Sequence, residues 1–372
     1  MPPNTLGVAL ALTVFGESHG RCVGMVLDGC PAGLEVSERD LEEPLRDRVP
    51  RVPGLSSGRA EEDKVEILSG VFRGRTTGAP ICALVWNRDV EDQPYLELEG
   101  VPRPGHADYP AYVRYGGFHD FRGGGIFSGR MTVPYIMGGA IALKLLSLVG
   151  VEVLAYTVEI AGIRAGELDL DALRRNTPLS PVRCGDLEAS KLMVARILEA
   201  AGEGDSVGGV VEAQALGLPP GLGDPIFDSI DSDLAKFLLA VPGVKGVEFG
   251  SGFEASRMKG SSFNDQYVLR NGRVAAASNN AGGILGGLTT GMPLKVRVAF
   301  KPTPSISKPQ ASVDLRSMEP REITVRGRHD PCIVPKAVPV VRSVVAVVLA
   351  DHLIRAAVIP RVLRGLASDW KT

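Results

Sequence analysis

Residues 103–130 hold side chains whose types and spacing suit the binding of a multiply charged anion. His106 follows a Pro-Gly turn, so its ring is expected on a stiff loop. The glycines at 123–125 allow backbone N–H groups to approach a ligand closely. Arg122 and Arg130 flank these glycines and supply forked, permanently charged donors. The segment therefore predicts a phosphate or carboxylate site.

A helix is expected to follow the glycines. Ser128 can cap it, and apolar and small residues run over residues 132–148 with Pro134 in the first turn. The backbone donors and the positive dipole end of such a helix would add to the arginines as an anion site. A glycine-rich surface turn with solvated arginines is the alternative. The histidine and aspartate in the same segment favour the ligand site.

Other polar loops are also punctuated by glycine or proline. Residues 16–20 carry Ser18 and His19 directly after a predicted strand. Three more loops lie late in the chain, at residues 278–287, 301–305 and 327–332, the last with Asp330. Each loop alone is more typical of structure than of function. Five such loops in one chain indicate a composite site.

The chemistry available is acid–base catalysis beside fixed positive charge. His19, His106 and the loop carboxylate Asp330 can carry protons, and arginines at positions 48, 103, 122, 130 and 328 can stabilise negative charge. Arg48 stands in a basic run that, taken alone, favours a solvated loop. A metal site is disfavoured, because the candidate ligands sit on separate loops without helical spacing. These residues suit acid catalysis on a leaving phosphate.

Composition narrows the class of protein. The chain has 372 residues, 44% of them hydrophobic, a net charge of -2 and a pI near 6.3, which argues against nucleic acid or an anionic membrane as a partner. Five cysteines without paired spacing favour a reducing compartment. The N-terminal residues lack the pattern of a signal peptide, and charged residues interrupt the apolar region 338–359. We expect a cytoplasmic protein.

The order of predicted elements favours an α+β fold with antiparallel sheets in one large domain, residues 1–372. A capping box at Ser37 and Asp40 opens a short helix that buries Leu41 and Leu45. Further helices are expected over residues 132–148, 168–175, 187–201 and 232–240. Strands are expected over residues 6–15, 23–27, 65–72, 80–86, 151–160, 207–217, 244–249 and 294–300. The apolar last helix holds His352, predicted to be structural.

Six separated motifs resemble those of chorismate synthase, in the same order and over nearly the whole chain. They are residues 16–20 (GESHG), 65–72 (VEILSGVF), 103–108 (RPGHAD), 120–125 (DFRGGG), 280–284 (NAGGI) and 327–332 (GRHDPC). The resemblance implies the anti-1,4-elimination of phosphate and a ring C6 proton from 5-enolpyruvylshikimate 3-phosphate, which gives chorismate. It also implies reduced FMN as a cofactor, without net oxidation.

Family likeness assigns roles to individual residues. It implies that His19 donates a proton to the leaving phosphate and that His106 donates to the reduced flavin. It implies that Asp330, working with Ser18, helps the flavin accept the substrate proton. The implied substrate contacts are Arg48, Arg103, Arg130 and Arg328. The implied cofactor contacts are Ser128, Asn280, Ala281, Gly282, Gly283, Lys301, Pro302, Thr303, Pro304, Ser305 and Arg328.

The resemblance further implies a homotetramer whose subunits form a β-α-β sandwich, with helices between antiparallel sheets. This chain departs from the family pattern in two places. Ile126 and Phe127 stand where the family commonly has Arg-Ser, and Gly54 stands where some members have an arginine associated with NADPH. We therefore expect NADPH to be absent or weak as an electron source. A flavin-dependent NADPH oxidoreductase and a non-catalytic phosphate- or flavin-binding protein are the alternatives.

Overall fold

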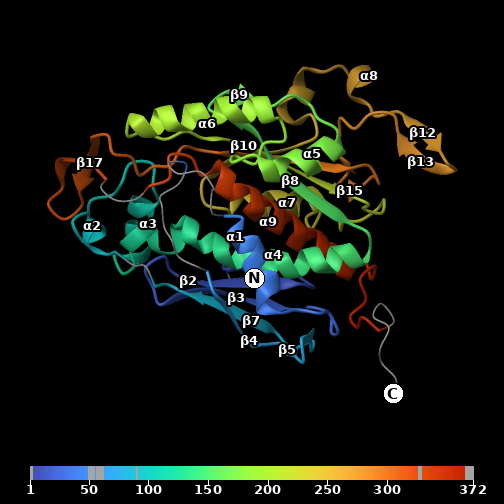
Figure 1. Cartoon of the computed structure of the whole chain (residues 1–372), viewed down its shortest axis with the longest axis horizontal. Helices are drawn as coiled ribbons and strands as arrows, with labels where there is room; N and C mark the ends of the chain where they lie inside the picture. Colours follow the sequence, from blue (N-terminus) through green and yellow to red (C-terminus); the bar gives the residue numbers. More distant parts are fainter. Residues whose placement is uncertain (1–2, 49–54, 56–62, 89–90, 326–328, 365–372) are drawn as a thin grey trace.

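Two antiparallel sheets enclose a layer of helices (Figure 1). The computed structural model describes residues 3–48, 55, 63–88, 91–325 and 329–364. The first sheet has the strand order β1-β2-β3-β7-β4, and the second has the order β11-β16-β10-β8-β9. The predicted α+β class, with helices between antiparallel sheets, is confirmed.

The first sheet is built from short strands near the N-terminus. Its strands are β1 (Thr5–Leu6), β2 (Ala11–Gly16), β3 (Cys22–Asp28), β4 (Val65–Ser69) and β7 (Ile81–Trp86). The region 6–15, predicted as one strand, is divided into β1 and β2 by a turn at Gly7, with φ +87°. The end of β2 delivers Ser18 and His19 to the site.

The second sheet carries the later loops. It consists of β8 (Glu152–Ile160), β9 (Ile163–Arg164), β10 (Gly209–Leu216), β11 (Val244–Phe249) and β16 (Leu294–Phe300). In β16 the residues at 294, 296, 298 and 300 are buried and those between them are partly exposed, as expected for a sheet with one face on the core. The Phe300 end of β16 leads directly into Lys301.

The helices between the sheets supply most of the core. α4 (Thr132–Leu148) packs on α1 (Glu38–Arg46), β3 and α9, and α9 (Val334–Arg355) also contacts α7 (Ile230–Leu239), β8 and β10. The capping box at Ser37 is confirmed. α6 (Leu187–Gly202) lies on the opposite side of the second sheet from α9 (Figure 1). One hydrophobic cluster runs through both sheets and these helices, so the chain forms one domain.

Among the described residues, two helical segments are apolar and long enough to cross a membrane, residues 129–148 and 334–355. Their hydrophobic windows are 78% and 94% buried, respectively, inside the protein. A helix that is apolar on all sides belongs in a core when other elements surround it. Both are therefore core helices of a soluble protein fold.

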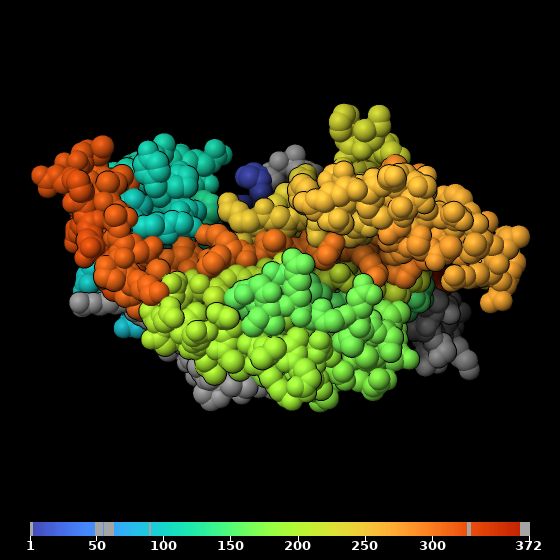
Figure 2. Space-filling model, turned by 90° about the horizontal axis from the view of Figure 1, so that it is seen from above, coloured from blue at the N-terminus to red at the C-terminus, as the bar shows by residue number. Residues whose placement is uncertain are grey.

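Smaller elements line the edges of the molecule. In Figures 1 and 2 the β12–β13 hairpin projects at one end, and the β17–β18 hairpin lies near α3 at the other. The predicted strand over residues 65–72 is interrupted at Gly70, with φ +83°. The smaller helices and strands are α2 (Gln93–Leu96), α3 (Asp108–Tyr115), α5 (Leu170–Asn176), α8 (Gly260–Phe263), β5 (Val71–Phe72), β6 (Arg75–Thr76), β12 (Tyr267–Arg270), β13 (Arg273–Ala276), β14 (Ile284–Leu285), β15 (Leu288–Thr289), β17 (Gln310–Asp314) and β18 (Glu319–Ile323).

Candidate active site

The triple glycine runs between the two loop histidines. Gly123 and Gly124 have φ values of +58° and +87°, a region that L side chains rarely adopt. A Cβ at Gly123 would lie 2.4 Å from Cδ2 of His19, and a Cβ at Gly124 would lie 2.8 Å from Cε1 of His106. The glycines are therefore required for the close packing of both rings against this loop.

His19 lies on one side of this loop and is 5% exposed. Its Nδ1 lies 2.7 Å from Oδ1 of Asp92, and its ring meets Tyr95 edge-on at a centroid distance of 5.0 Å. Its Nε2 is buried and has no hydrogen-bond partner in the part of the chain that the structure describes. Because buried polar atoms normally have partners, Nε2 is available to a ligand.

Arg122 connects Asp92 to the glycine loop. Its Nη1 donates to Oδ2 of Asp92 at 2.8 Å, and its Nε and Nη2 donate to the two oxygens of Asp120 at 2.9 and 2.8 Å. The hydrogen bonds from His19 and Arg122 hold the pKa of Asp92 below its usual range. Arg122, predicted as part of the anion site, is thus shared between two protein carboxylates.

His106 lies on the other side of the loop in a more buried cluster. Its Nδ1 lies 2.5 Å from Oδ1 of Asp108. Arg103, 6% exposed, binds Asp108 with two hydrogen bonds, from Nε to Oδ2 at 2.7 Å and from Nη2 to Oδ1 at 2.9 Å. The bidentate geometry fixes both partners. All three residues belong to the RPGHAD motif.

Burial sets the protonation state of this cluster. It lowers the pKa of His106, and the hydrogen bond to Asp108 offsets only part of that effect, while the charges of Arg103 and Lys301 lower the pKa further. The pKa of Asp108 is held well below its usual range by the hydrogen bonds from His106 and Arg103, although burial opposes them. At neutral pH the imidazole of His106 is therefore neutral, with Nδ1 donating to an ionised Asp108.

The segment after β16 adjoins the same cluster. Nη1 of Arg103 donates to Oγ of Ser305 at 3.2 Å, and Nζ of Lys301 donates to the backbone oxygen of Gly105. Burial and the nearby Lys245 lower the pKa of Lys301. The structure thus brings the predicted 301–305 loop next to the predicted histidine loop.

Two further predicted arginines share one carboxylate. Nη1 of Arg130 donates to Oδ1 of Asp63 at 2.5 Å, and Nη1 of Arg48 lies 3.4 Å from Oδ2 of the same residue. Arg130 is also held by Oδ1 of Asn87 at 3.0 Å from its Nε. Arg48 therefore belongs to an ordered charge cluster, which its basic sequence run alone did not favour.

Ser18 and Ser128 meet beside His19. The Oγ of Ser128 donates to the Oγ of Ser18 at 3.1 Å. Ser128 also caps the short 3-10 turn Gly129–Met131 by accepting from the backbone N–H of Arg130. This turn precedes α4, so Ser128 does not cap α4 itself, contrary to the sequence prediction. The two hydroxyls extend the polar surface on the His19 side of the glycine loop.

The remaining predicted residues lie elsewhere or outside the described residues. Asp330 forms an ion pair with Lys336 at 2.6 Å. The loop 280–283 lies at the Leu294 end of β16, where the backbone N–H groups of Asn280 and Ala281 donate to Asp265. Arg328 and Gly54 fall outside the described residues. Within the described ranges, no group of three or more His, Cys, Asp or Glu side chains is placed to hold a metal ion.

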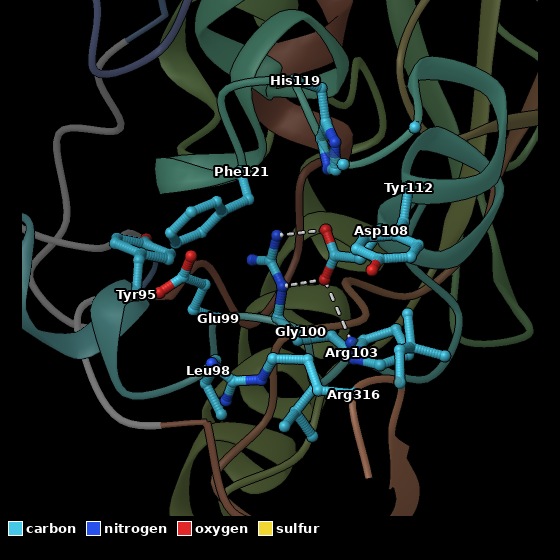
Figure 3. A pocket seen from close by; sticks show the side chains of 15 residues that line it. Tyr95, Leu98, Glu99, Gly100, Arg103, Asp108, Tyr112, His119, Phe121 and Arg316 are labelled. Atoms are coloured by element: carbon cyan, nitrogen blue, oxygen red, sulfur yellow. Dashed lines mark hydrogen bonds and ion pairs between the residues drawn. The ribbon is translucent and has the colours of Figure 1, made fainter. Parts of the chain in front are cut away.

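A cavity of about 280 Å³ opens beside the Arg103–Asp108 pair (Figure 3). Aromatic side chains line it, and the ring of His119 points into it from above (Figure 3). It shares Arg103 and Asp108 with the His106 cluster. The cavity therefore continues the polar centre toward α3 and the β17–β18 hairpin.

Sequence reasoning missed two carboxylates that hold predicted site residues. Asp63 lies 67 residues from Arg130, and Asp92 lies 73 residues from His19, in segments for which no strand or helix was predicted. The pairings of Asp108 with His106 and of Asp120 with Arg122, each two residues apart, could have been predicted from local spacing. Asp92 and Tyr95 stand three residues apart at the start of α2, which was a weak signal that they share one face.

Two positioned histidines beside arginine clusters define an enzyme that performs acid–base chemistry on an anionic substrate. The chorismate synthase family model matches residues 10–354. A chorismate synthase of Korarchaeum cryptofilum is 53% identical over 356 residues, 96% of this chain and 99% of that protein. One of Dehalococcoides mccartyi is 50% identical over 361 residues, 97% and 99% of the two chains.

A solved structure agrees with these relatives. The crystal structure of a chorismate synthase superposes with a TM-score of 0.75 at 31% identity, covering 94% of this chain and 93% of that one. The chain belongs to the chorismate synthase family. Its activity is accordingly that of a phosphate-eliminating lyase in the shikimate pathway of aromatic amino acid biosynthesis. This assignment decides against the oxidoreductase and the non-catalytic binding protein.

Proposed function

We propose that the substrate is 5-enolpyruvylshikimate 3-phosphate and that the site removes its phosphate by anti-1,4-elimination to give chorismate. The observation that carries this proposal is the pair of histidines on opposite sides of Gly123 and Gly124. The buried, unpartnered Nε2 of His19 is suited to hold a proton for the leaving phosphate. Arg130 and Arg48 would bind the anionic groups of the substrate, with Arg103 and Arg328 as further contacts.

The chain's residues fit a phosphate-bearing flavin. Reduced FMN, when bound, would supply electron density that assists cleavage of the C–O bond without net oxidation. Lys301 and Ser305 lie beside the His106 loop and offer a charged and a neutral donor for its phosphate. Thr303, between the two fixed prolines at 302 and 304, has a buried hydroxyl without a partner in the described part of the chain, which also suits a ligand.

Each titratable residue has a proposed role in moving protons. His106 would hold its proton on Nδ1 and present Nε2 toward the cofactor; it can donate from Nε2 only after taking up a second proton, which the negative charge of bound ligands would favour. Asp330, with Ser18, would help the bound flavin accept the proton that leaves ring C6. Ser128 is hydrogen-bonded to Ser18 and would orient its hydroxyl. The roles of His106, Asp330 and Ser18 follow from the family resemblance, and the role of Ser128 follows from its contact with Ser18.

We also propose a cytoplasmic homotetramer. Strand β16 has seven residues, so about 20 Å separate the 280–283 loop from Lys301 in one chain. Both segments could serve one cofactor only if the loop of a neighbouring subunit approached. The β12–β13 hairpin supports association, because Tyr267, Leu269 and Val274 are 70%, 78% and 70% exposed. Leu269→Asp should shift the sedimentation coefficient toward smaller species, and an unchanged value would contradict this role of the hairpin.

An anaerobic assay with the substrate and chemically reduced FMN tests the proposed reaction. Chorismate and inorganic phosphate should form in equal amounts, with no net consumption of reduced flavin. Oxidised FMN with NADPH should give little product, because Gly54 replaces the arginine that some family members carry. Equal rates with NADPH and with dithionite would contradict the last expectation. Flavin oxidised in proportion to product would contradict the proposed reaction itself.

Lys301 provides a separate test of the cofactor site. Lys301→Met should weaken FMN binding about ten- to a hundredfold, the value of one charge-assisted hydrogen bond to a phosphate. Riboflavin lacks the phosphate, so its affinity should change little. Titration of both flavins into wild type and variant measures the difference. Equal losses for the two flavins would assign Lys301 to the fold or to the flavin ring.

A further inference from the structure

Asp92 is the only contact to His19 in the described residues that selects between the two ring nitrogens. An ionised carboxylate accepts hydrogen bonds and cannot donate them, so Nδ1 of His19 must carry a hydrogen to make the 2.7 Å contact. Nε2 is then the nitrogen that gains or loses a proton. That nitrogen is the one left buried and unpartnered.

Asp92 is itself fixed from its other side. Arg122 donates to its Oδ2, and Arg122 is in turn held by both oxygens of Asp120. Tyr95, on the same short helix, packs edge-on against the imidazole. The charged groups facing His19 are therefore Asp92, Arg122 and Asp120, and two of the three carry negative charge.

We propose that Asp92 is a positioning residue for the elimination: it fixes the ring of His19 and its Nδ1–H tautomer so that Nε2 faces the leaving group. The proposal rests on the proposed role of His19. An aspartate that holds an imidazole in one tautomer is an established device in other enzymes, and its conversion to asparagine there lowers turnover by about 10⁴-fold through the wrong tautomer. In this role Asp92 acts through His19.

The competing explanation is an ordinary surface ion pair between Asp92 and Arg122. Their side chains are 36% and 33% exposed, and pairs of that kind contribute little to stability. The two explanations differ in what a neutral substitute does. An ion pair predicts unchanged turnover, whereas a positioning role predicts a slow enzyme that remains folded.

The test compares Asp92→Asn with two reference variants in the complete enzyme. Asp92→Asn should lower kcat about 10²- to 10⁴-fold with a small change in KM, because the amide can donate to Nδ1 and reverse the tautomer. Asp92→Glu should recover part of the loss. Glu152→Gln is the matched control. Glu152 lies on β8 of the second sheet, and its half-exposed carboxylate pairs with Arg174 of α5. The turnover of this variant should stay at the wild-type value.

Nitrogen-15 spectra of the imidazoles give a readout that a merely structural role would not move. The chain has only five histidines, and the resonances of His19 are assigned by their loss in His19→Gln. Wild type should show a protonated Nδ1 and an unprotonated Nε2 at alkaline pH, and Asp92→Asn should reverse or mix them. Near wild-type kcat and an unchanged tautomer in Asp92→Asn would overturn the proposal. If His19→Gln itself kept full turnover, the catalytic role of His19 would fail, and the positioning role with it.

Discussion

The two histidine–carboxylate pairs on either side of the glycine loop are built differently. His106 and Asp108 are two residues apart, and Asp108 is locked by the buried Arg103. His19 and Asp92 are 73 residues apart, and Asp92 is locked by the half-exposed Arg122. The first pair is a local turn stabilised by burial, and the second is assembled from distant segments at the edge of the site.

This difference in exposure should change how substitutions on the two sides affect folding stability, but not how they affect turnover. On the His106 side, a charged group removed from the cluster leaves its partner in a poorly solvated place, which costs folding free energy. On the His19 side, Asp92 and Arg122 are each about one-third exposed, so water can solvate either of them when the other is removed and the folding free energy changes little. Substitutions on the two sides should therefore affect turnover similarly and stability differently.

Removal of either imidazole should give the largest effect. His19→Ala and His106→Ala should each lower turnover by about two to four orders of magnitude, the usual size of an acid–base contribution, with a smaller change in substrate binding. Single-turnover kinetics under anaerobic conditions measures both. His352→Gln, which removes a buried histidine paired with Asp233, is the control and should affect stability but not turnover per folded molecule. Near wild-type turnover in one alanine variant would remove that histidine from the mechanism.

Substitution of the two carboxylates should lower the free energy of unfolding by different amounts. Asp108→Asn should lower the free energy of unfolding by about 3 to 5 kcal/mol, because the buried Arg103 loses its charged bidentate partner. Asp92→Asn should lower it by less than about 1 kcal/mol. Urea denaturation followed by circular dichroism measures both values. Equal losses would mean that the exposure of the two pairs does not control their contribution to folding.

Substitution of each glycine should displace the ring of one histidine. Alanine at Gly123 would meet His19, and alanine at Gly124 would meet His106, so each should reduce turnover about a hundredfold through misplacement of one ring. Both also carry the cost of a left-handed residue, roughly 1 to 2 kcal/mol. Gly129→Ala is the control in the same loop, because its Cβ would enter open space. Imidazole nitrogen-15 shifts should show which ring moves, and identical changes in both variants would contradict this division.

The smallest effect concerns pH. The pKa of His106 is lower in the folded protein than the usual value near 6.5, so its contribution to stability is present above pH 6.5 and is lost as pH falls toward the lowered folded pKa. The loss cannot exceed about 1.4 kcal/mol per pH unit for one group. Asp108 stays ionised until far lower pH. His106→Gln should flatten the stability profile just below pH 6.5 relative to wild type, and parallel profiles would argue against the buried neutral imidazole.

Local sequence was enough for several parts of this enzyme. Strands at 244–249 and 294–300 and the capping box at Ser37 follow from short-range alternation and hydrogen bonding, which act over a few residues. Regions 6–15 and 65–72 were misread as single strands, because one glycine with positive φ can divide an apolar run without changing its pattern. Strands nevertheless form within both of these regions.

The candidate site was likewise only partly predictable from the sequence. The motifs identified the two histidines, the glycines and the arginines, since these residue types are required by the chemistry itself. The motifs did not reveal which carboxylate holds which side chain. Asp63 joins Arg48 to Arg130, and Asp92 joins His19 to Arg122, through segments that carry no local pattern.

The sequence by itself determined the family and the α+β class and supplied the candidate site residues, because these depend on residue identity and short-range spacing. Only the tertiary structure decided that Gly123 and Gly124 separate His19 from His106, and that Asp92 contacts Nδ1 of His19. Contacts between residues tens of positions apart depend on how the first sheet, α2 and the glycine loop pack together. That packing is a property of the whole hydrophobic core, which no single segment encodes.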